Sequence, residues 1–317
     1  MEQYKEFYDE GDLSSYPPKP KFEQSPKGMI SISLNFIFYI LIYLFLFQGD
    51  LKLLAAILMV MFVHEFGHFV WMKKYNYVER NLFFIPFMNY FLPDSEGNQI
   101  TLREKLILVF FGPFPGLLLG FTAIWLGDYK GNSDLSNLGW IFMVWNLMNL
   151  LPLDSLDGGV LSSVLFKSNE YLVKLITSIV ITVFLLGYIW LSQSFITILI
   201  PVFLFLRLNA LKKLYRLRYE LESKGIDWQI HYDELNNKQY WMIRKEMGGA
   251  ESQHQNVEML NEISGNFMER MMSQQIKSVL QNPPYDDLSK RGKFLAISLW
   301  ILLFAIPLTF LFLFAKA

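Results

Sequence analysis

The sequence contains no cysteine among its 317 residues. Disulfides, thiol nucleophiles and thiolate metal ligands are therefore excluded, and a bound transition metal would have to be held by imidazole and carboxylate groups. Histidine is also scarce, with four in the chain. An excess of one charge is missing too: the formal net charge is -1, which gives no reason to expect nucleic acid or another strongly charged partner.

Apolar residues, in contrast, are abundant. Hydrophobic residues make up 53% of the chain and aromatic residues 17%, which is too apolar for a soluble domain of this length. We therefore expect an all-α polytopic membrane protein embedded in a lipid bilayer. The first 27 residues differ from the rest because they are polar and rich in proline. They do not resemble a secretory signal and are predicted to form a flexible cytosolic tail.

Apolar stretches along the chain set the expected number of membrane spans. A helix needs about 20 apolar residues to cross about 30 Å of hydrocarbon. Seven stretches meet or approach this length: residues 29–47, 51–72, 106–126, 138–152, 172–191, 195–208 and 294–314. Lysine and arginine concentrate in the N-terminal tail and after the second, fourth and sixth stretches. The N-terminus is therefore predicted to be cytosolic and, with about seven spans, the C-terminus to lie on the opposite side.

Two further segments do not fit simple spans. Residues 82–92 are apolar but cover about half a helical crossing, and Pro86 interrupts them. We expect a short re-entrant hairpin there, which a membrane tolerates only beside protein or a wet cavity. Residues after 209 are polar, charged and helical in pattern. The expected organisation is a cytosolic tail (1–27), a transmembrane core (28–209), a cytosolic helical segment open to a regulatory role (210–291) and a C-terminal transmembrane helix (292–317).

One motif in the second apolar stretch carries chemistry. His64 and His68 are spaced i and i+4, so a helix places both imidazoles on one face at a separation suited to a single metal ion. Glu65 lies beside them. Ionisable groups are costly in a membrane helix, about 2.5 to 3.5 kcal/mol for an acidic residue near the centre. A metal site would recover that cost, and the alternative is a helix-end cluster that reaches the headgroups.

A hydrolytic zinc site needs a third protein ligand and one open position. His231 and His254 lie in the polar segment and are expected to be surface residues. Carboxylates that follow the fourth apolar stretch are the remaining candidates, namely Asp154 and Asp157. Spacing does not choose between them, although Asp154 could instead cap a helix that restarts after Pro152.

Two motifs together resemble the signature of a known family. The segment His64-Glu65-Phe66-Gly67-His68 is followed by Asn149-Leu150-Leu151-Pro152 and, after four further residues, by Asp157-Gly158. In this order they resemble the site-2 protease family of intramembrane zinc metalloproteases. The resemblance covers about residues 28–166, including Gly112-Pro113-Phe114-Pro115-Gly116, which is similar to the Gly-Pro element of that family's central span.

The resemblance implies a function and a set of roles. The expected activity is a zinc-dependent endopeptidase that cleaves transmembrane segments of membrane-anchored substrates, here in a prokaryotic cell membrane. The roles that it implies are Zn²⁺ ligation by His64, His68 and Asp157, acid/base catalysis by Glu65, and substrate contact by Asn149. No PDZ-like loop and no paired nucleotide-binding repeats are visible in the sequence.

Other interpretations of these features stay open. The metal site could belong to a catalytically silent scaffold, or the ionisable groups to a transporter-like path. Asn149 could make an interhelical hydrogen bond, and residues 112–116 could serve close helix packing instead of a kink. The hairpin could simply pack over the spans. The cytosolic segment, with apolar positions between Val257 and Met271, could dock on the membrane domain, lie on the bilayer, self-associate or bind a regulator.

Overall fold

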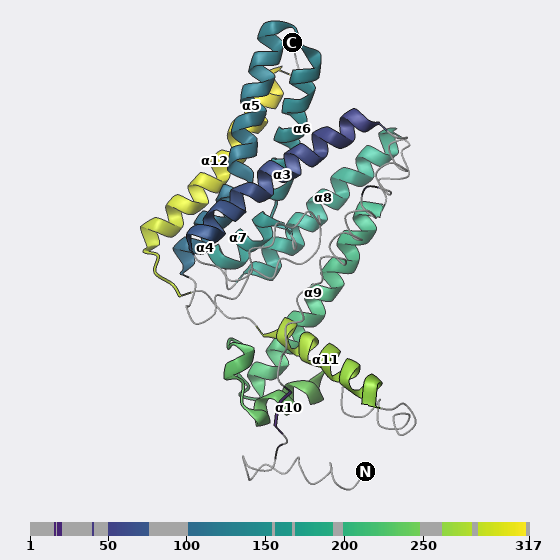
Figure 1. Ribbon diagram of the computed structural model, residues 1–317, viewed down its shortest axis with the longest axis vertical. Coiled ribbons are helices and arrows are strands. Elements are labelled where there is room, and N and C mark those ends of the chain that lie inside the picture. The colour runs from purple at the N-terminus through teal and green to yellow at the C-terminus, as the bar shows by residue number, and fades with distance from the viewer. Residues whose placement is uncertain are drawn as a thin grey trace. The chain divides into compact units, whose positions relative to one another are not determined.

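The computed structural model in Figure 1 describes residues 16, 18–20, 40, 50–75, 101–153, 156–166, 169–192, 199–247, 262–280 and 285–314. Within these residues the chain is helical apart from turns and one isolated bridge, which confirms the all-α class. Two compact units are present, one of Lys27–Arg207 with Pro284–Ala317 and one of Met1–Pro26 with Leu208–Pro283. The helices are α3 (Leu51–Lys74), α4 (Leu102–Phe111), α5 (Pro113–Lys130), α6 (Ser133–Asn149), α7 (Asp157–Leu165), α8 (Glu170–Ser192), α9 (Leu199–Ser223), α10 (Asn237–Glu246), α11 (Glu262–Val279) and α12 (Lys290–Phe314), with the short 3₁₀ helix η4 (Tyr232–Glu234).

Four helical stretches of the described chain are long and apolar enough to cross a membrane, not the predicted seven. They are Leu51–Lys74, Leu102–Lys130, Glu170–Ile189 and Lys290–Phe310. They support a multi-pass membrane protein, whereas the count of seven is not confirmed. The fourth predicted span is α6, whose 17 residues cover about 25 Å.

Two other predicted membrane elements lie largely or wholly outside the part of the chain that the structure describes. The first span, 29–47, has one described residue, and the hairpin at 82–92 has none. The described part of the sixth predicted span, 195–208, belongs to a longer helix. The helix there is α9, which continues to Ser223 through a segment rich in lysine and arginine.

Gly112 separates α4 from α5 in the middle of the third apolar stretch. Pro113 is the first residue of α5, where its missing N–H is harmless, but its ring would clash with a carbonyl one turn earlier in a continuous helix. The chain therefore ends one helix at Phe111 and starts another at Pro113. The break or kink predicted for residues 112–116 lies at this point.

Small residues allow α5 and α6 to pack with their backbones in contact. A Cβ atom at Gly120 would lie 3.0 Å from the Gly139 carbonyl oxygen, and one at Gly139 would lie 2.7 Å from the Gly120 carbonyl oxygen. Gly116 and Gly120 form a Gly-x-x-x-Gly pattern, which is typical of close helix pairs in membranes. Gly131, at a left-handed φ of 64°, closes the turn between the two helices. Of the two interpretations of residues 112–116, close helix packing applies to Gly116, one turn beyond the break, where a Cβ would meet Asn146 of α6.

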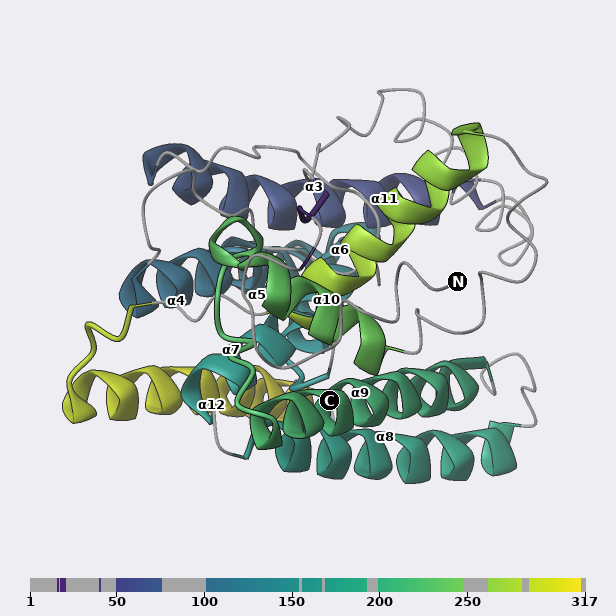
Figure 2. The same cartoon turned by 90° about the horizontal axis from the view of Figure 1, so that it is seen from below.

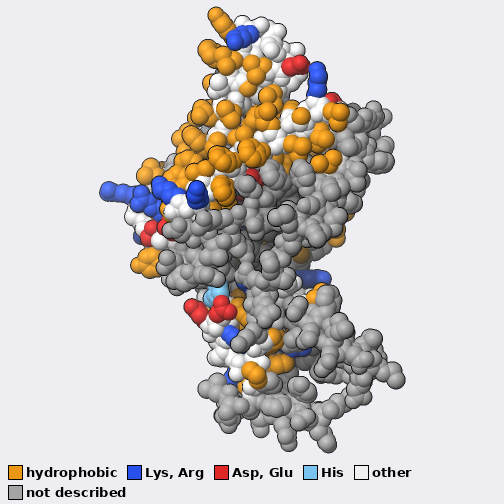
Figure 3. Space-filling model, in the orientation of Figure 1, with side chains coloured by type: hydrophobic (Ala, Val, Ile, Leu, Met, Phe, Trp, Pro, Cys, Tyr) orange, Lys and Arg blue, Asp and Glu red, His pale blue; other side chains and the backbone are white. Residues whose placement is uncertain are grey.

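The core of this unit joins α12 to helices that are distant in sequence. Its buried and partly buried apolar residues come from α4, α5, α6, α7 and α12. Phe310 of α12 contacts Phe121 of α5 and Trp140 of α6 with ring centroids 4.8 and 6.1 Å apart. Figures 1 and 2 show α7 beside α4. Hydrophobic side chains spread over the outer face of α3, α5 and α12 (Figure 3), as expected for a surface in contact with lipid.

The start of α4 is fixed by local caps and by the segment that precedes α12. Thr101 and Glu104 form a capping box, in which each side chain accepts a hydrogen bond from the other's backbone N–H. The Arg103 N–H donates to Asp287 Oδ1 at 3.0 Å, and the Leu102 N–H donates to the Tyr285 carbonyl at 2.8 Å. Donors at a helix start have no partner within the helix, so these contacts hold α4 in place.

The second unit has its own core around α10 and the end of α11. Its buried residues include Tyr240 and Ile243 of α10 and Ile276 of α11. Lys19 joins this unit, because its Nζ donates to three backbone carbonyls, those of Tyr232, Asp233 and Leu235, at 2.7, 2.7 and 2.5 Å.

The apolar positions predicted between Val257 and Met271 lie mostly outside the described side chains. Met271 itself is 41% exposed. A role of this segment in regulation or self-association stays a prediction.

We expect Gly139→Ala to destabilise the membrane unit, because the new Cβ would meet the backbone of α5. Overpacking of this kind costs about 1 to 3 kcal/mol. Thermal unfolding in detergent should show a lower midpoint for this variant. Gly187→Ala on α8 is the matched control, since no atom of the described residues lies within 4 Å of a Cβ at that position. Equal midpoints for the two variants would contradict the proposed backbone contact.

Candidate metal centre

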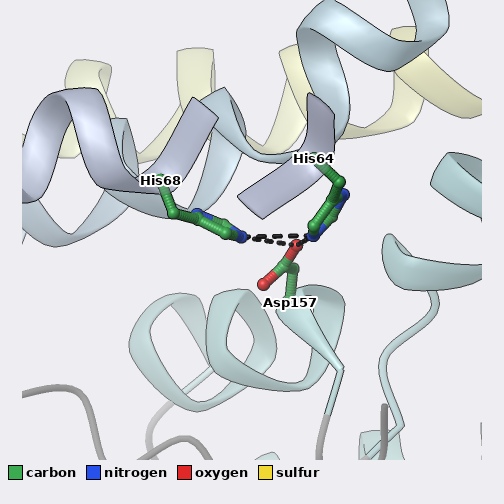
Figure 4. Close-up of side chains that lie close together, drawn as sticks. All are labelled: His64, His68 and Asp157. Atoms are coloured by element: carbon green, nitrogen blue, oxygen red, sulfur yellow. Dashed lines mark hydrogen bonds and ion pairs between the residues drawn. The ribbon is translucent and has the colours of Figure 1, made fainter. Parts of the chain in front are cut away.

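His64 and His68 lie one turn apart on α3 and are buried, with 4% and 6% of their surface exposed. Because both are on the same face of the helix, their Nε2 atoms approach to 3.2 Å (Figure 4). The surrounding helix is apolar, and its neighbours on the other faces are methionine, phenylalanine and valine. The pair is thus removed from bulk water, and its hydrogen bonds have to come from polar groups of the protein.

Asp157, the first residue of α7, supplies the third group. Its Oδ2 lies 3.0 Å from His64 Nε2 and 3.3 Å from His68 Nε2 (Figure 4). Leu156 is extended, at φ -111° and ψ 162°, so α7 starts with Asp157 directed at α3. Asp157, one of the two carboxylates that the sequence left open, thus lies beside both histidines. Asp154 lies outside the described residues.

Two acceptors outside the trio fix the tautomers of the imidazoles. His68 Nδ1 donates to the Leu108 carbonyl of α4 at 2.9 Å. His64 Nδ1 lies 2.9 Å from Asn146 Oδ1 of α6. The Asn146 amide nitrogen donates to the Phe142 carbonyl, so its oxygen is the atom that accepts from His64. With both protons on Nδ1, the lone pair on each Nε2 is directed inward.

The trio therefore presents three electron pairs to one small volume. Asp157 Oδ2 is buried and has no hydrogen-bond partner among the described residues. Neighbouring lone pairs repel each other, and a cation between them removes the repulsion. Tetrahedral zinc with bonds of about 2.0 to 2.1 Å separates its ligands by about 3.3 Å. The observed separations of 3.0, 3.2 and 3.3 Å and the nitrogen and oxygen donors fit that ion.

Glycines leave room for the site. A Cβ at Gly112 would collide with His68 Nε2, and a Cβ at Gly116 would collide with the Asn146 amide. Gly67, between the histidines, lies against the Phe111 carbonyl in the same way. Glycine at the break between α4 and α5, and at the close approach of α5 to α6, therefore leaves room for the imidazoles and for Asn146.

The structure places the other predicted residues as follows. Glu65 is buried, with 7% exposed, beside His64. Asn149 is half-buried at the end of α6, and its amide donates to the Trp145 carbonyl within the same helix at 3.0 Å. His231 caps η4, and its Nδ1 lies 3.1 Å from Asp233 Oδ2. His254 lies outside the described residues.

Sequence reasoning missed Asn146 and the Leu108 carbonyl. Asn146 is fully buried on a membrane helix, and an amide in that position needs a partner from another element. This signal was available in the sequence, but it gave no means of preferring Asn146 to Asn149. The Leu108 carbonyl belongs to the backbone and leaves no signal in a sequence.

Comparison with known proteins gives one relative. Stage IV sporulation protein FB of Bacillus subtilis (strain 168) is 27% identical over 143 residues, which are 44% of this chain and 49% of that protein. The match thus spans about half of the relative's length. That relative is a site-2 protease family member. The resemblance to the site-2 protease family is confirmed. No family model matches the chain, and no solved structure matches it.

The family resemblance and the geometry concern the same residues. The site-2 protease motifs of the sequence lie on α3, at the end of α6 and at the start of α7. The buried trio joins α3 to α7, and α6 contacts it through Asn146. The Gly-Pro element lies at the break between α4 and α5, next to His68. Segments that are distant in the chain and that carry the resemblance therefore converge on one candidate metal site.

We expect Asn146→Ala to weaken zinc binding about 10- to 100-fold, because His64 would lose the acceptor that orients it. Competition with a chromogenic chelator measures this affinity in detergent. Asn149→Ala is the matched control, since its amide bonds within its own helix, and it should leave the affinity unchanged. A loss of zinc in the Asn149 variant and not in the Asn146 variant would reverse the assignment.

Proposed function

We propose that the chain is a zinc-dependent intramembrane endopeptidase that cleaves transmembrane segments of membrane-anchored proteins. The observation that carries the proposal is the buried convergence of His64, His68 and Asp157 next to Glu65 on an apolar helix. Two imidazoles, one carboxylate and an adjacent glutamate are the groups required for metal-assisted hydrolysis. The relationship to a site-2 protease family member supports the same activity.

The chain's own residues would hold the ion through three atoms. His64 and His68 offer Nε2 and Asp157 offers Oδ2, while Asn146 and Leu108 hold the imidazoles by their Nδ1 protons. When bound, zinc would polarise the scissile carbonyl and lower the pKa of a water molecule to about 7. With three protein ligands, a zinc ion here would keep one position open for that water or for the substrate.

Glu65 would move the proton. Its carboxylate takes a proton from the attacking water as the water oxygen bonds to the scissile carbonyl carbon. The same carboxyl group then gives the proton to the amide nitrogen as the carbon–nitrogen bond breaks, so that one water is consumed for each peptide bond. Burial of Glu65 keeps this transfer away from bulk solvent.

Access of the substrate follows from the membrane setting. A peptide bond in a transmembrane helix is shielded by its own hydrogen bonds and has to be unwound before attack. We assign to residues 82–92, which the sequence predicts to form a hairpin, the role of pairing with the extended substrate, and to Asn149 that of binding a substrate backbone group. The position of Asn149 at the end of α6, before the segment that leads to Asp157, supports this role.

The orientation predicted from the sequence completes the proposal. With a cytosolic N-terminus in a prokaryotic cell membrane, the end of α3 that carries Lys73 and Lys74 lies at the cytoplasmic side. The site would then cut substrates near that side. The second unit is the part of the chain that a cytosolic regulator or a second copy could contact.

Glu65→Gln should reduce cleavage of a co-reconstituted single-pass substrate by about 10²- to 10⁴-fold, because the amide cannot accept the proton. Zinc content should stay at the wild-type level. His64→Ala is the comparison, and it should lose zinc and cleavage together. Proteolysis retained by the Glu65→Gln protein would refute its role. Absence of turnover in the wild type with zinc bound would favour a scaffold.

Asp157→Asn should lower zinc content, because the third ligand loses its charge. Asp154→Asn is the control and should bind zinc as the wild type does. Elemental analysis of the purified proteins decides between them. The opposite pattern, with zinc lost only from the Asp154 variant, would show that Asp154 is the third ligand.

A further inference from the structure

Trp300 links the last helix to the end of α6. Its indole Nε1–H donates to the Leu150 carbonyl at 2.9 Å, in a buried contact between residues 150 positions apart. Trp300 is 7% exposed and belongs to the same apolar core as Leu147, Leu150 and Leu161. Trp300 thus contacts residues on either side of the segment that leads to Asp157, Leu150 before it and Phe166 after it.

The Leu150 carbonyl is also the surface against which α7 begins. Gly158, directly after Asp157, lies so close to the Leu150 and Leu151 backbone that a Cβ atom there would collide with it. Leu150 itself is completely buried and caps α6. The position of this carbonyl therefore sets the position of the first turn of α7, which carries Asp157.

A donor is needed at this carbonyl for a physical reason. The last carbonyls of a helix have no partner within the helix, and water is absent from an apolar interior. Leaving the Leu150 oxygen without a donor would favour a rearrangement of the chain that finds one. Because α7 packs directly on that oxygen, the rearrangement would move Asp157, whereas a metal ligand has to be held within about 0.5 Å of its place.

We propose that Trp300 is a positioning residue for the metal site, which holds the Asp157 carboxylate in reach of His64 and His68 through the Leu150 carbonyl. This inference rests on the proposed function, because it takes the trio as the zinc site. It gives a role to the C-terminal helix, whose sequence lies outside the region of family resemblance.

The test compares two substitutions on the same face of α12. Trp300→Phe keeps an aromatic ring and removes the N–H, and Phe304→Leu perturbs a residue one turn away that packs on the same core. In full-length protein, Trp300→Phe should weaken zinc binding about 10-fold and change the visible spectrum of bound Co²⁺. Phe304→Leu should change neither the zinc affinity nor the Co²⁺ spectrum. This difference should hold even if the two metal-free variants have equally lowered thermal midpoints.

A double-mutant cycle separates positioning from general destabilisation. If Trp300 acts through Asp157, Trp300→Phe should have no further effect on the residual zinc affinity of Asp157→Asn. Trp300→His retains a ring N–H and should recover part of the affinity. Wild-type affinity and Co²⁺ spectrum in Trp300→Phe would overturn the inference. So would an equal loss in Phe304→Leu, or an effect that persists in the Asp157→Asn background.

The same measurements distinguish this inference from the proposed activity. A wild-type protein that binds zinc and cleaves no substrate would remove the protease assignment, while the affinities would still test Trp300. A wild-type protein that binds no zinc would overturn the metal site and the role of Trp300 with it.

Discussion

Two imidazole nitrogens and one carboxylate oxygen point at one another inside an apolar helix bundle, and the fold around them follows from that constraint. His64, His68 and Asp157 present lone pairs at separations of 3.0 to 3.3 Å. Bulk water does not reach them, since all three side chains are buried. In a medium without water such an arrangement is costly unless a cation occupies it. Contacts from four further helices, α4, α5, α6 and α12, keep these groups together.

Hydrogen bonds and close packing from these helices hold the imidazoles in place. Each imidazole donates its Nδ1 proton to a group on a different helix, Asn146 of α6 or Leu108 of α4. Glycines allow the close approaches around these groups, Gly67 between α3 and α4 and Gly116 between α5 and α6. The caps at the start of α4 and the Trp300 contact at the end of α6 fix the two acceptor helices in turn. The site is thus held by close packing and by hydrogen bonds to backbone carbonyls and to the Asn146 side chain.

Some elements could be predicted from the sequence, and others could not. The i, i+4 histidines required a helix, and a proline inside an apolar stretch required a break, because both depend on local backbone geometry. The number of spans was harder. Hydropathy counted the short stretch at α6 as a span, and it ended the sixth span at residue 208, where α9 in fact continues. Helix length depends on hydrogen bonds and neighbours as well as on hydropathy, so composition did not fix these boundaries.

By itself, the sequence determined that the chain is an all-α membrane protein without thiol chemistry, and that it carries a histidine pair spaced to hold one metal ion beside a glutamate. These properties follow from composition and from the periodicity of one helix. Only the tertiary structure decided that Asp157 reaches that pair, that Asn146 and not Asn149 orients His64, and that α12 contacts the end of α6 through Trp300. Such contacts join residues far apart in the chain, and their distances depend on how whole helices pack, which no local pattern of residues records.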